Sequence, residues 1–362
     1  MIPAYFPRRL RRLRRLRRLR RLRAPKGVAA VVLCVLGALC GAWLQPSYGT
    51  LSSAPAAPET DAVETAWQAV PRDLPEIRAS GVLRHLGVPY ANFVTGDGDG
   101  LDMRLIQEFA EELGVEHVYV PASWEDIFPR LLGREVARRG GEVTLGAPVA
   151  IEGDLIANGL TVLPWREQII DYSHPTFPTQ IWLLTRDDAE IEPVRPSGSI
   201  EADLRAVNAR LNGRTVLCKA GTCLDPELYG LQQLGARTIE FEGTLNELAP
   251  AVIANRAEMT ILDVPDALVA LRKWPGRIKV IGPISPQQAM GVGFSESAPQ
   301  LRAAFNAFFE ECWESGRYRE WIVEYYPTAL KYYPEFFARR SPAELPAQLA
   351  PEVLETPVAE RE

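Results

Sequence analysis

The sequence predicts an α/β protein whose folded body has two lobes. Between residues 70 and 330, short apolar segments of strand length alternate with segments of amphipathic helical periodicity. The alternation runs as two series, separated by the polar, proline-containing stretch 187–201. Strands that alternate with helices predict parallel pairing within each series, and two series predict two lobes. We expect a cleft between the lobes, where small ligands usually bind.

Each element is assigned from its hydrophobic pattern. In the first lobe, placed at 69–186, the pattern predicts strands at 82–88, 117–120, 155–162, 169–172 and 180–185, and helices at 101–113 and 124–132. In the second lobe, placed at 187–285, it predicts strands at 215–218, 238–241, 259–262 and 278–281, and helices at 224–234, 245–255 and 264–272. The chain then returns to the first lobe over 286–340, with a strand at 291–294 and helices at 299–314 and 318–325.

The N-terminal residues predict a segment that targets the protein to a membrane. Residues 1–26 contain 12 of the 40 lysines and arginines and no acidic residue, which is typical of a basic arm in the cytoplasm. The next 18 residues, 27–44, carry no charge and approach the roughly 20 that span a bilayer. We expect a single-pass transmembrane anchor with an exported body, and a cleaved signal peptide is the alternative. Residues 45–68 predict a linker and 341–362 a disordered tail.

Charge and cysteine usage exclude several classes of function. The net charge is −6 although the arm is strongly basic, so the body is acidic and does not suit nucleic acid as a partner. His85, His117 and His174 are scattered and no paired Cys/His spacing occurs, so we expect no metal and no cofactor. Cys218 and Cys223 are separated by four residues, a spacing that allows a small disulfide loop in an oxidising compartment.

Several motifs follow one another in the order and spacing of a known family. They are Asp-Leu-Pro-Glu-Ile-Arg at 73–78, Gly-Asp-Leu-Ile-Ala-Asn-Gly-Leu-Thr at 153–161, Pro-Trp-Arg at 164–166, Ile-Asp-Tyr-Ser at 170–173 and Ile-Leu-Asp at 261–263. Over about 70–330 the chain resembles the family 3 extracellular solute-binding proteins, the amino-acid-binding components of ABC importers. The resemblance implies a two-lobed periplasmic-binding-protein fold of type II.

The motif at 154–161 is also similar to the binding domain of F-type membrane-bound lytic murein transglycosylases. The aromatic segment at 325–334 is similar to the end of that domain. In those proteins a helical, lysozyme-like domain follows. Only 22 residues follow Arg340 here, too few for such a domain, so we expect no lytic activity from this chain.

The resemblance implies a ligand site whose first part recognises a carboxylate. It places Arg166 on the ligand carboxylate, where a planar guanidinium donates two parallel hydrogen bonds, and the Thr161 hydroxyl beside it. Gly221 and Thr222 would add backbone N–H groups at the end of a strand and the start of a helix. Simpler roles stay open, namely a surface ion pair for Arg166, a structural threonine, and an ordinary turn at 221–222.

The second part of the implied site recognises an ammonium group and a side chain. Asp263 matches the carboxylate that holds an α-ammonium, and it also suits the N-cap of the helix that follows. Tyr90 and Trp124 match aromatic positions around the ligand side chain, and ordinary core packing is the alternative for both. Cys223 stands where the family often has a hydroxyl, so this side of the site differs.

Further departures from the family leave the ligand open. The usual acidic residue is missing from 86–90, His174 replaces a common Asp, and the segment 133–153 is longer than the family needs. An amino acid, a small peptide and a cell-wall fragment all remain candidates.

The sequence therefore predicts a non-enzymatic solute-binding protein in the periplasm, held at the inner membrane by 27–44. Its partners would be a small carboxylate-bearing ligand and an ABC permease, for uptake or sensing. The alternative is a non-catalytic scaffold or regulator of cell-wall enzymes. A dehydratase on the same fold, with Glu240, Glu242 or Asp263 as general acid, is the least favoured reading because no motif marks these residues.

Overall fold

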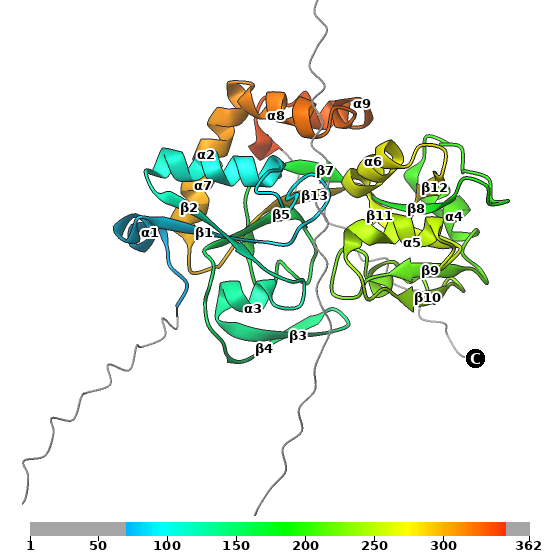
Figure 1. Cartoon of the computed structure of the whole chain (residues 1–362), viewed down its shortest axis with the longest axis horizontal. Helices are drawn as coiled ribbons and strands as arrows, with labels where there is room; N and C mark the ends of the chain where they lie inside the picture. The colour runs from blue at the N-terminus through cyan, green and yellow to red at the C-terminus, as the bar shows by residue number, and fades with distance from the viewer. Residues whose placement is uncertain (1–69, 345–362) are drawn as a thin grey trace, which may run out of the picture. The chain divides into compact units, whose positions relative to one another are not determined.

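The structure is a computed structural model that describes residues 70–344 (Figure 1). No helix in this range is both long and apolar enough to span a bilayer. The predicted basic arm, the anchor at 27–44 and the linker at 45–68 lie outside the described residues, as does the predicted tail from 345 onward. The described part of the chain forms two lobes, each built on its own sheet.

The first lobe is built on a mixed sheet with the order β2-β1-β5-β13-β6, in which β7 also pairs with β13. β1 runs parallel to β2 and β5, and β13 runs antiparallel to its neighbours. The strands are β1 Val82–Gly87, β2 Glu116–Pro121, β5 Leu155–Thr161, β6 Asp171–Tyr172, β7 Phe177–Thr179 and β13 Gln288–Phe294. The helices of this lobe are α1 Leu74–Ser80, α2 Leu101–Leu113, α3 Ile127–Leu132, α7 Pro299–Glu314 and α8 Arg317–Tyr325.

The second lobe is built on a five-stranded sheet with the order β10-β9-β11-β8-β12. β9 runs parallel to β10 and β11, whereas β8 runs antiparallel to β11 and β12. The strands are β8 Ile181–Arg186, β9 Thr215–Cys218, β10 Arg237–Glu240, β11 Met259–Asp263 and β12 Ile278–Pro283. The helices are α4 Ile200–Asn208, α5 Leu248–Ile253 and α6 Val264–Lys273, with 3-10 turns η1 Pro226–Tyr229 and η2 Leu245–Glu247.

The position of β8 corrects the predicted lobe boundary. The sequence pattern placed this strand in the first lobe and the boundary at 186/187. In the structure β8 pairs with β11 and β12, so the chain crosses between the lobes just after β7. The polar stretch 187–201 therefore lies within the second lobe. The hydrophobic pattern of a buried strand shows that it is covered, but not which sheet it joins.

The predicted helix at 224–234 is also wrong. Only the 3-10 turn η1 forms there. Pro226 has no N–H to donate, and Gly230 takes a left-handed conformation at φ 58°, which ends the turn after four residues. Leu224 and Leu231 are nevertheless fully buried, so the apolar spacing that suggested a helix is used by a compact loop instead.

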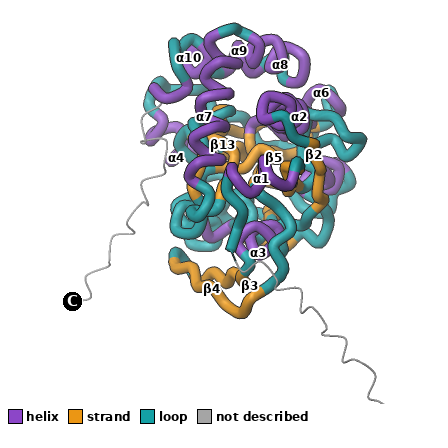
Figure 2. The backbone as a smooth tube through the Cα atoms, turned by 90° about the vertical axis from the view of Figure 1, so that its left-hand side faces the viewer, coloured by secondary structure: helices purple, strands orange, loops and turns teal. Residues whose placement is uncertain are grey.

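A β-hairpin occupies the segment that is longer than the family needs. β3 Arg134–Arg139 and β4 Glu142–Pro148 pair with each other and with no other strand of the described chain. Figure 2 shows this hairpin at the opposite end of the molecule from α8. It was not predicted from the sequence, because its residues are mostly charged or exposed and carry only a short hydrophobic alternation.

Gly159 shapes the end of β5, from which the chain enters the candidate site. Its φ is +68°, and a Cβ at this position would lie 2.4 Å from the Phe93 ring. The backbone N–H of Gly159 donates to the buried Asp102 carboxylate at 2.7 Å. Only glycine satisfies both the backbone conformation and the close approach of Phe93.

The aromatic C-terminal segment bridges the two lobes. Tyr326, just after α8, packs against Phe93 and Phe177 of the first lobe, and its hydroxyl accepts the N–H of Asn92 at 2.9 Å. The short helices α9 Ala329–Tyr332 and α10 Pro334–Phe337 then reach the second lobe. There Tyr333 and Phe336 form a small apolar cluster with Val264 of α6. This segment links the lobes independently of the strands that cross between them.

Asp154 is expected to be a major contributor to the stability of the first lobe. Its fully buried carboxylate accepts hydrogen bonds from Arg72 at 2.5 Å and Arg84 at 2.7 Å. Substitution Asp154→Asn removes the charge between two guanidinium groups and should lower the free energy of unfolding by about 3 kcal/mol. In the matched control, Asp188→Asn, the side chain is 79% exposed and the loss should stay below about 0.5 kcal/mol. Urea unfolding of the two variants tests this, and equal losses would contradict it.

Candidate functional site

A cluster of buried polar side chains lies where the two lobes meet. We call it the interlobe cluster, and its members are Tyr90, Thr161, Arg166, Cys223 and Asp263. Thr161 is the last residue of β5 and Asp263 the last of β11, while the other three lie in the segments that follow β1, β5 and β9. All therefore come from the carboxyl ends of parallel strands, the edge at which α/β sheets usually bind ligands.

The guanidinium of Arg166 is fixed in position by three aromatic rings. It is fully buried and lies 5.5, 5.4 and 5.2 Å from the ring centres of Trp124, Phe128 and Trp165. Its Nη1 donates to the Thr161 carbonyl at 2.9 Å, whereas Nε and Nη2 have no hydrogen-bond partner. A buried cation with free N–H groups is unfavourable unless an acceptor arrives, and a carboxylate matches this geometry best.

Two hydroxyl groups near Arg166 also lack partners. The buried Tyr90 hydroxyl faces the Asp263 carboxylate and the buried Thr161 hydroxyl faces the Cys223 thiol, but neither makes a hydrogen bond of normal geometry within the described residues. The Trp124 ring packs edge-on against Tyr90, with ring centres 6.4 Å apart, so this half-buried tryptophan touches both Tyr90 and Arg166. Burial and the neighbouring Asp263 carboxylate raise the pKa of Tyr90 well above its usual value. Tyr90 therefore stays protonated and can donate a hydrogen bond.

Asp263 supplies the negative charge of the cluster. Its side chain caps α6, because Oδ1 accepts the N–H of Asp266 at 3.2 Å, so the predicted N-cap role is present. Its Oδ2 faces the Cys223 thiol at 3.9 Å. Burial raises the pKa of Asp263 to about 6, so the carboxylate is ionised at neutral pH but close to its titration range. Asp266 is buried beside it, and burial together with the Asp263 charge raises the pKa of Asp266.

The Cys223 thiol connects the two halves of the cluster. Burial and the Asp263 charge raise its pKa to about 12, while Arg166 and the Thr161 hydroxyl act on it from the first lobe. Cys223 is therefore a neutral thiol in contact with residues of both lobes.

The structure corrects the predicted disulfide between Cys218 and Cys223. Both thiols are buried and free. The Cys218 sulfur faces the Val216 carbonyl at 3.6 Å, inside the second sheet, whereas the Cys223 sulfur faces Asp263. The two side chains thus point to different surroundings, and the loop between them is held by hydrogen bonds instead.

Gly221 and Thr222 use their polar groups within that loop. The Gly221 N–H donates to Asp225 Oδ2 at 3.2 Å. The Thr222 hydroxyl donates to the Lys219 carbonyl at 2.8 Å and accepts the Leu224 N–H at 3.0 Å. The helix expected behind them is only the four-residue turn η1. These two residues stabilise the loop that carries Cys223. No helix of the predicted length follows them, so no helix dipole supports an anion site at their N–H groups.

Three residues next to the cluster were not predicted from the sequence. Trp165 supports the Arg166 guanidinium, the Tyr229 hydroxyl donates to the Cys223 carbonyl at 2.6 Å, and Gln288 Nε2 is buried without a partner. Trp165 was detectable as the neighbour of Arg166 in the sequence. No sequence motif marked Tyr229 or Gln288. Tyr229 lies in a loop that was expected to be helical, and Gln288 begins β13, the strand with which the chain returns to the first lobe.

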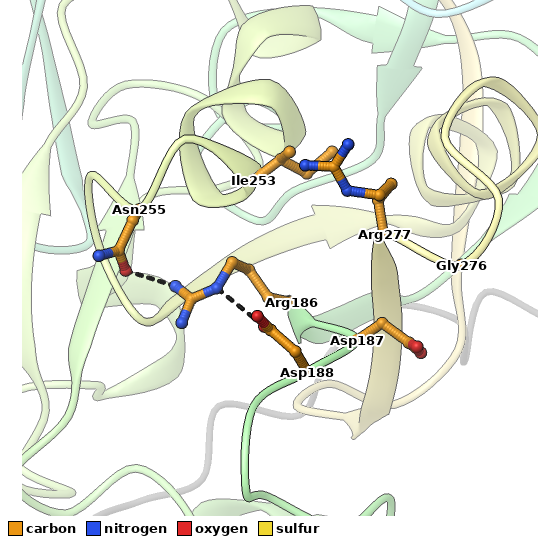
Figure 3. Close-up of a pocket in the computed structure, with 7 residues that line it drawn as sticks. All are labelled: Arg186, Asp187, Asp188, Ile253, Asn255, Gly276 and Arg277. Atoms are coloured by element: carbon orange, nitrogen blue, oxygen red, sulfur yellow. Dashed lines mark hydrogen bonds and ion pairs between the residues drawn. The ribbon is translucent and has the colours of Figure 1, made fainter.

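A separate pocket of 370 Å³ lies on the second lobe and is lined by Arg186, Asp187, Asp188, Ile253, Asn255, Gly276 and Arg277 (Figure 3). Strands β8 and β11 pair antiparallel over their full length. Arg186 follows the β8 residue that pairs with Met259, at one end of β11, whereas Asp263 lies at the other end of β11. The Arg186 guanidinium is already bonded to Asp188 and Asn255. This pocket is therefore remote from the interlobe cluster, and the Arg186 charge in it is paired with Asp188. Within residues 70–344, no group of His, Cys, Asp and Glu side chains is arranged to hold a metal ion.

Two sheets joined by crossing segments, with a buried arginine and a buried aspartate where they meet, have the architecture of a two-lobed binding protein. Residues 147–328 match the family described as bacterial extracellular solute-binding proteins, family 3. The match covers half of the chain, and the chain belongs to this family.

A curated relative is the membrane-bound lytic murein transglycosylase F of Desulfosudis oleivorans, 28% identical over 234 residues. The alignment covers 63% of this chain, and the chain spans 44% of the relative's length. The predicted similarity to this group of proteins is thereby confirmed for the aligned part.

Solved structures of amino-acid-binding proteins share the fold. A mutant of ArgBP from T. maritima superimposes with a TM-score of 0.57 at 21% identity, covering 70% of this chain and 99% of that one. A substrate-binding protein of an ABC uptake transporter from Streptococcus pneumoniae, solved with bound histidine, gives 0.57 at 14% identity, with coverages of 70% and 96%. At these identities the likeness establishes the two-lobed fold and nothing finer.

Asp263 should make the ligand-free protein less stable as the pH rises. Because its folded pKa of about 6 exceeds the ordinary value of 3.8, its contribution favours the folded state below about pH 4 and is lost as the pH rises through about 6. Asp263→Asn keeps a side-chain oxygen for the cap but cannot titrate. Between pH 4 and 7, wild type should therefore lose about 2–3 kcal/mol more stability than the variant. Urea unfolding at each pH measures the difference, and parallel pH profiles would refute it.

Proposed function

We propose that this chain is a solute-binding protein that captures a small zwitterionic ligand, such as an amino acid, at the interlobe cluster. The observation that carries the proposal is the set of buried, unpartnered donors opposite a buried carboxylate. Arg166 Nε and Nη2 and Thr161 Oγ1 have no acceptor, and the buried Asp263 carboxylate beside Tyr90 and Cys223 supplies the opposite charge of the cluster. Such groups are rarely left unsatisfied in a folded interior, so a bound molecule is their natural partner.

Each group has a chemical role in this proposal. Arg166 binds the ligand carboxylate through Nε and Nη2, and Thr161 donates to the same group. Asp263 holds the ammonium group, and the Tyr90 hydroxyl oxygen accepts a second N–H from it. Trp124 packs against both Tyr90 and the Arg166 guanidinium, and in this proposal its ring contacts the ligand side chain. The Arg166–Asp263 arrangement favours a ligand that carries both charges, because either charge alone would leave one buried ion uncompensated.

The chain binds rather than catalyses in this proposal. We further propose that it acts outside the cytoplasm, anchored by residues 27–44, with an ABC permease or a sensory partner reading the ligand-bound form. The basic residues before the apolar stretch support this orientation. The amino-acid-binding proteins that share its fold support the ligand class.

A second candidate is favoured by one observation, the relationship to a lytic murein transglycosylase. On this alternative the chain is a non-catalytic regulator of cell-wall enzymes, and the ligand is a wall fragment. Muropeptides also carry carboxylate and ammonium groups, so the same cluster would recognise them. The two candidates are distinguished by which ligand binds.

The ligand class can be tested by thermal unfolding of the full chain with amino acids, short peptides and muropeptides. A ligand at 100 times its Kd should add about 2.7 kcal/mol of stability. Arg166→Lys keeps the charge but cannot donate two parallel bonds, so affinity should fall by at least about tenfold.

The control for that experiment is Arg302→Lys, at a half-buried arginine that pairs with Asp171 on the surface of the first lobe at 3.3 Å. It should leave ligand affinity unchanged. No stabilisation of wild type by any compound would rule out the zwitterion proposal.

Binding should also depend on pH through Asp263. Below its pKa of about 6 the carboxyl becomes neutral and loses its attraction for an ammonium group. Affinity should therefore decrease by up to about tenfold per pH unit below 6, and Asp263→Asn should bind weakly at every pH. Isothermal titration between pH 5 and 8 measures this, and a flat profile would mean that Asp263 does not hold the ammonium.

A further inference from the structure

The β3–β4 hairpin reaches from the first lobe toward the second. At its turn, the Gly141 carbonyl accepts a hydrogen bond from Gln168 Nε2 at 2.8 Å, so the tip is tied to the segment that carries Arg166. Figure 1 shows the hairpin below the first sheet, with its tip directed toward the second lobe. The hairpin thus lies beside the line along which the lobes meet.

Arg138 of the hairpin makes an ion pair with Asp225 of the second lobe. The Arg138 side chain is 16% exposed and that of Asp225 is 3% exposed. Among the ion pairs that join the lobes within the described residues, this one is the best shielded from water. The other two pairs, Arg138 with Glu227 and Lys219 with Glu125, each span 3.9 Å, and their glutamate side chains are 71% and 72% exposed. Exposed pairs of that kind contribute little to stability.

Both partners of this ion pair are connected to the interlobe cluster. Asp225 Oδ2 also accepts the Gly221 N–H at 3.2 Å, and its Oδ1 accepts the Glu227 N–H, so it holds the loop that carries Cys223. On the other side, the Arg138 guanidinium lies 5.6 Å from the centre of the Trp165 ring. The same ring lies 5.2 Å from the Arg166 guanidinium.

We propose that the β3–β4 hairpin is a latch that holds the lobes together through Arg138 and Asp225, whether or not a ligand is bound. When the lobes separate, Arg138 leaves Asp225 and the Cys223 loop loses one of its supports. The latch would regulate the interlobe cluster. Its expected effect on ligand affinity rests on the proposed function of that cluster. Its effect on lobe closure does not need a ligand.

The first experiment measures the distance between the lobes in the ligand-free full chain. Spin labels are attached at Glu112→Cys on α2 and Arg272→Cys on α6, both exposed, after Cys34 and Cys40 are replaced by serine. The three remaining native cysteines are buried. Double electron–electron resonance spectroscopy then measures the distance between the labels, and from it the populations of the closed and open forms.

Arg138→Ala should shift these populations toward the open state, lowering the closed-to-open ratio by about tenfold. Arg139→Ala is the matched control, because this neighbouring arginine is exposed and makes no ion pair in the described chain. It should leave the distance distribution unchanged.

An unchanged distance distribution in Arg138→Ala would overturn the latch. If that variant does not fold, Asp225→Asn serves instead, because it removes the charge and keeps one of the two acceptor oxygens that the loop uses. Where a ligand has been identified, Arg138→Ala should also weaken its binding by about tenfold, mainly through faster dissociation. Opening of the lobes in a protein that binds none of the tested compounds would support the latch and reject the proposed function.

Discussion

The buried guanidinium of Arg166 is the constraint on which the rest of the site depends. A charge in such a position is tolerated only because Trp124, Phe128 and Trp165 surround it and one N–H group is bonded to the Thr161 carbonyl. These contacts fix its orientation and leave Nε and Nη2 free. The arginine is therefore held ready for an acceptor before one arrives, which reduces the entropy lost on binding.

The second sheet supplies the opposite charge of the cluster, at the end of β11. Thr161 ends β5 and Asp263 ends β11, so the carboxyl ends of parallel strands in both lobes face the same region. Asp263 is also the N-cap of α6, and this structural role fixes the direction of its carboxylate. Burial keeps its pKa at about 6. The residue thus serves the fold and offers a charge to the site, and the two readings of the sequence are compatible.

The sequence predicted the parts of this protein that have a regular hydrophobic period. Helix α2 and strands β1 and β5 follow the pattern closely, and the motif around Arg166 identified the residue that proved to be buried with free donors. The pattern could not assign β8 to a sheet, because pairing is decided by partners far away in the chain. It also missed the hydrogen bond of Tyr229 to the Cys223 carbonyl, and the β3–β4 hairpin, whose ion pair with Asp225 forms only when the lobes come together. The predicted disulfide was wrong because the spacing of two cysteines does not fix where their side chains point, and Cys223 faces Asp263.

A latch that acts without ligand would change what ligand binding accomplishes. In a two-lobed protein that is mostly open, part of the binding free energy is spent on closure, so the apparent affinity is lower than the intrinsic one. Arg138 and the aromatic segment around Tyr333 both hold the lobes together, at opposite ends of the molecule. Closure is then partly supplied by the protein, which strengthens binding but reduces the structural difference between the free and bound forms. A partner protein that recognises the closed form would therefore distinguish less well between the free and the bound protein. Strong binding with a small structural change suits ligand capture better than signalling.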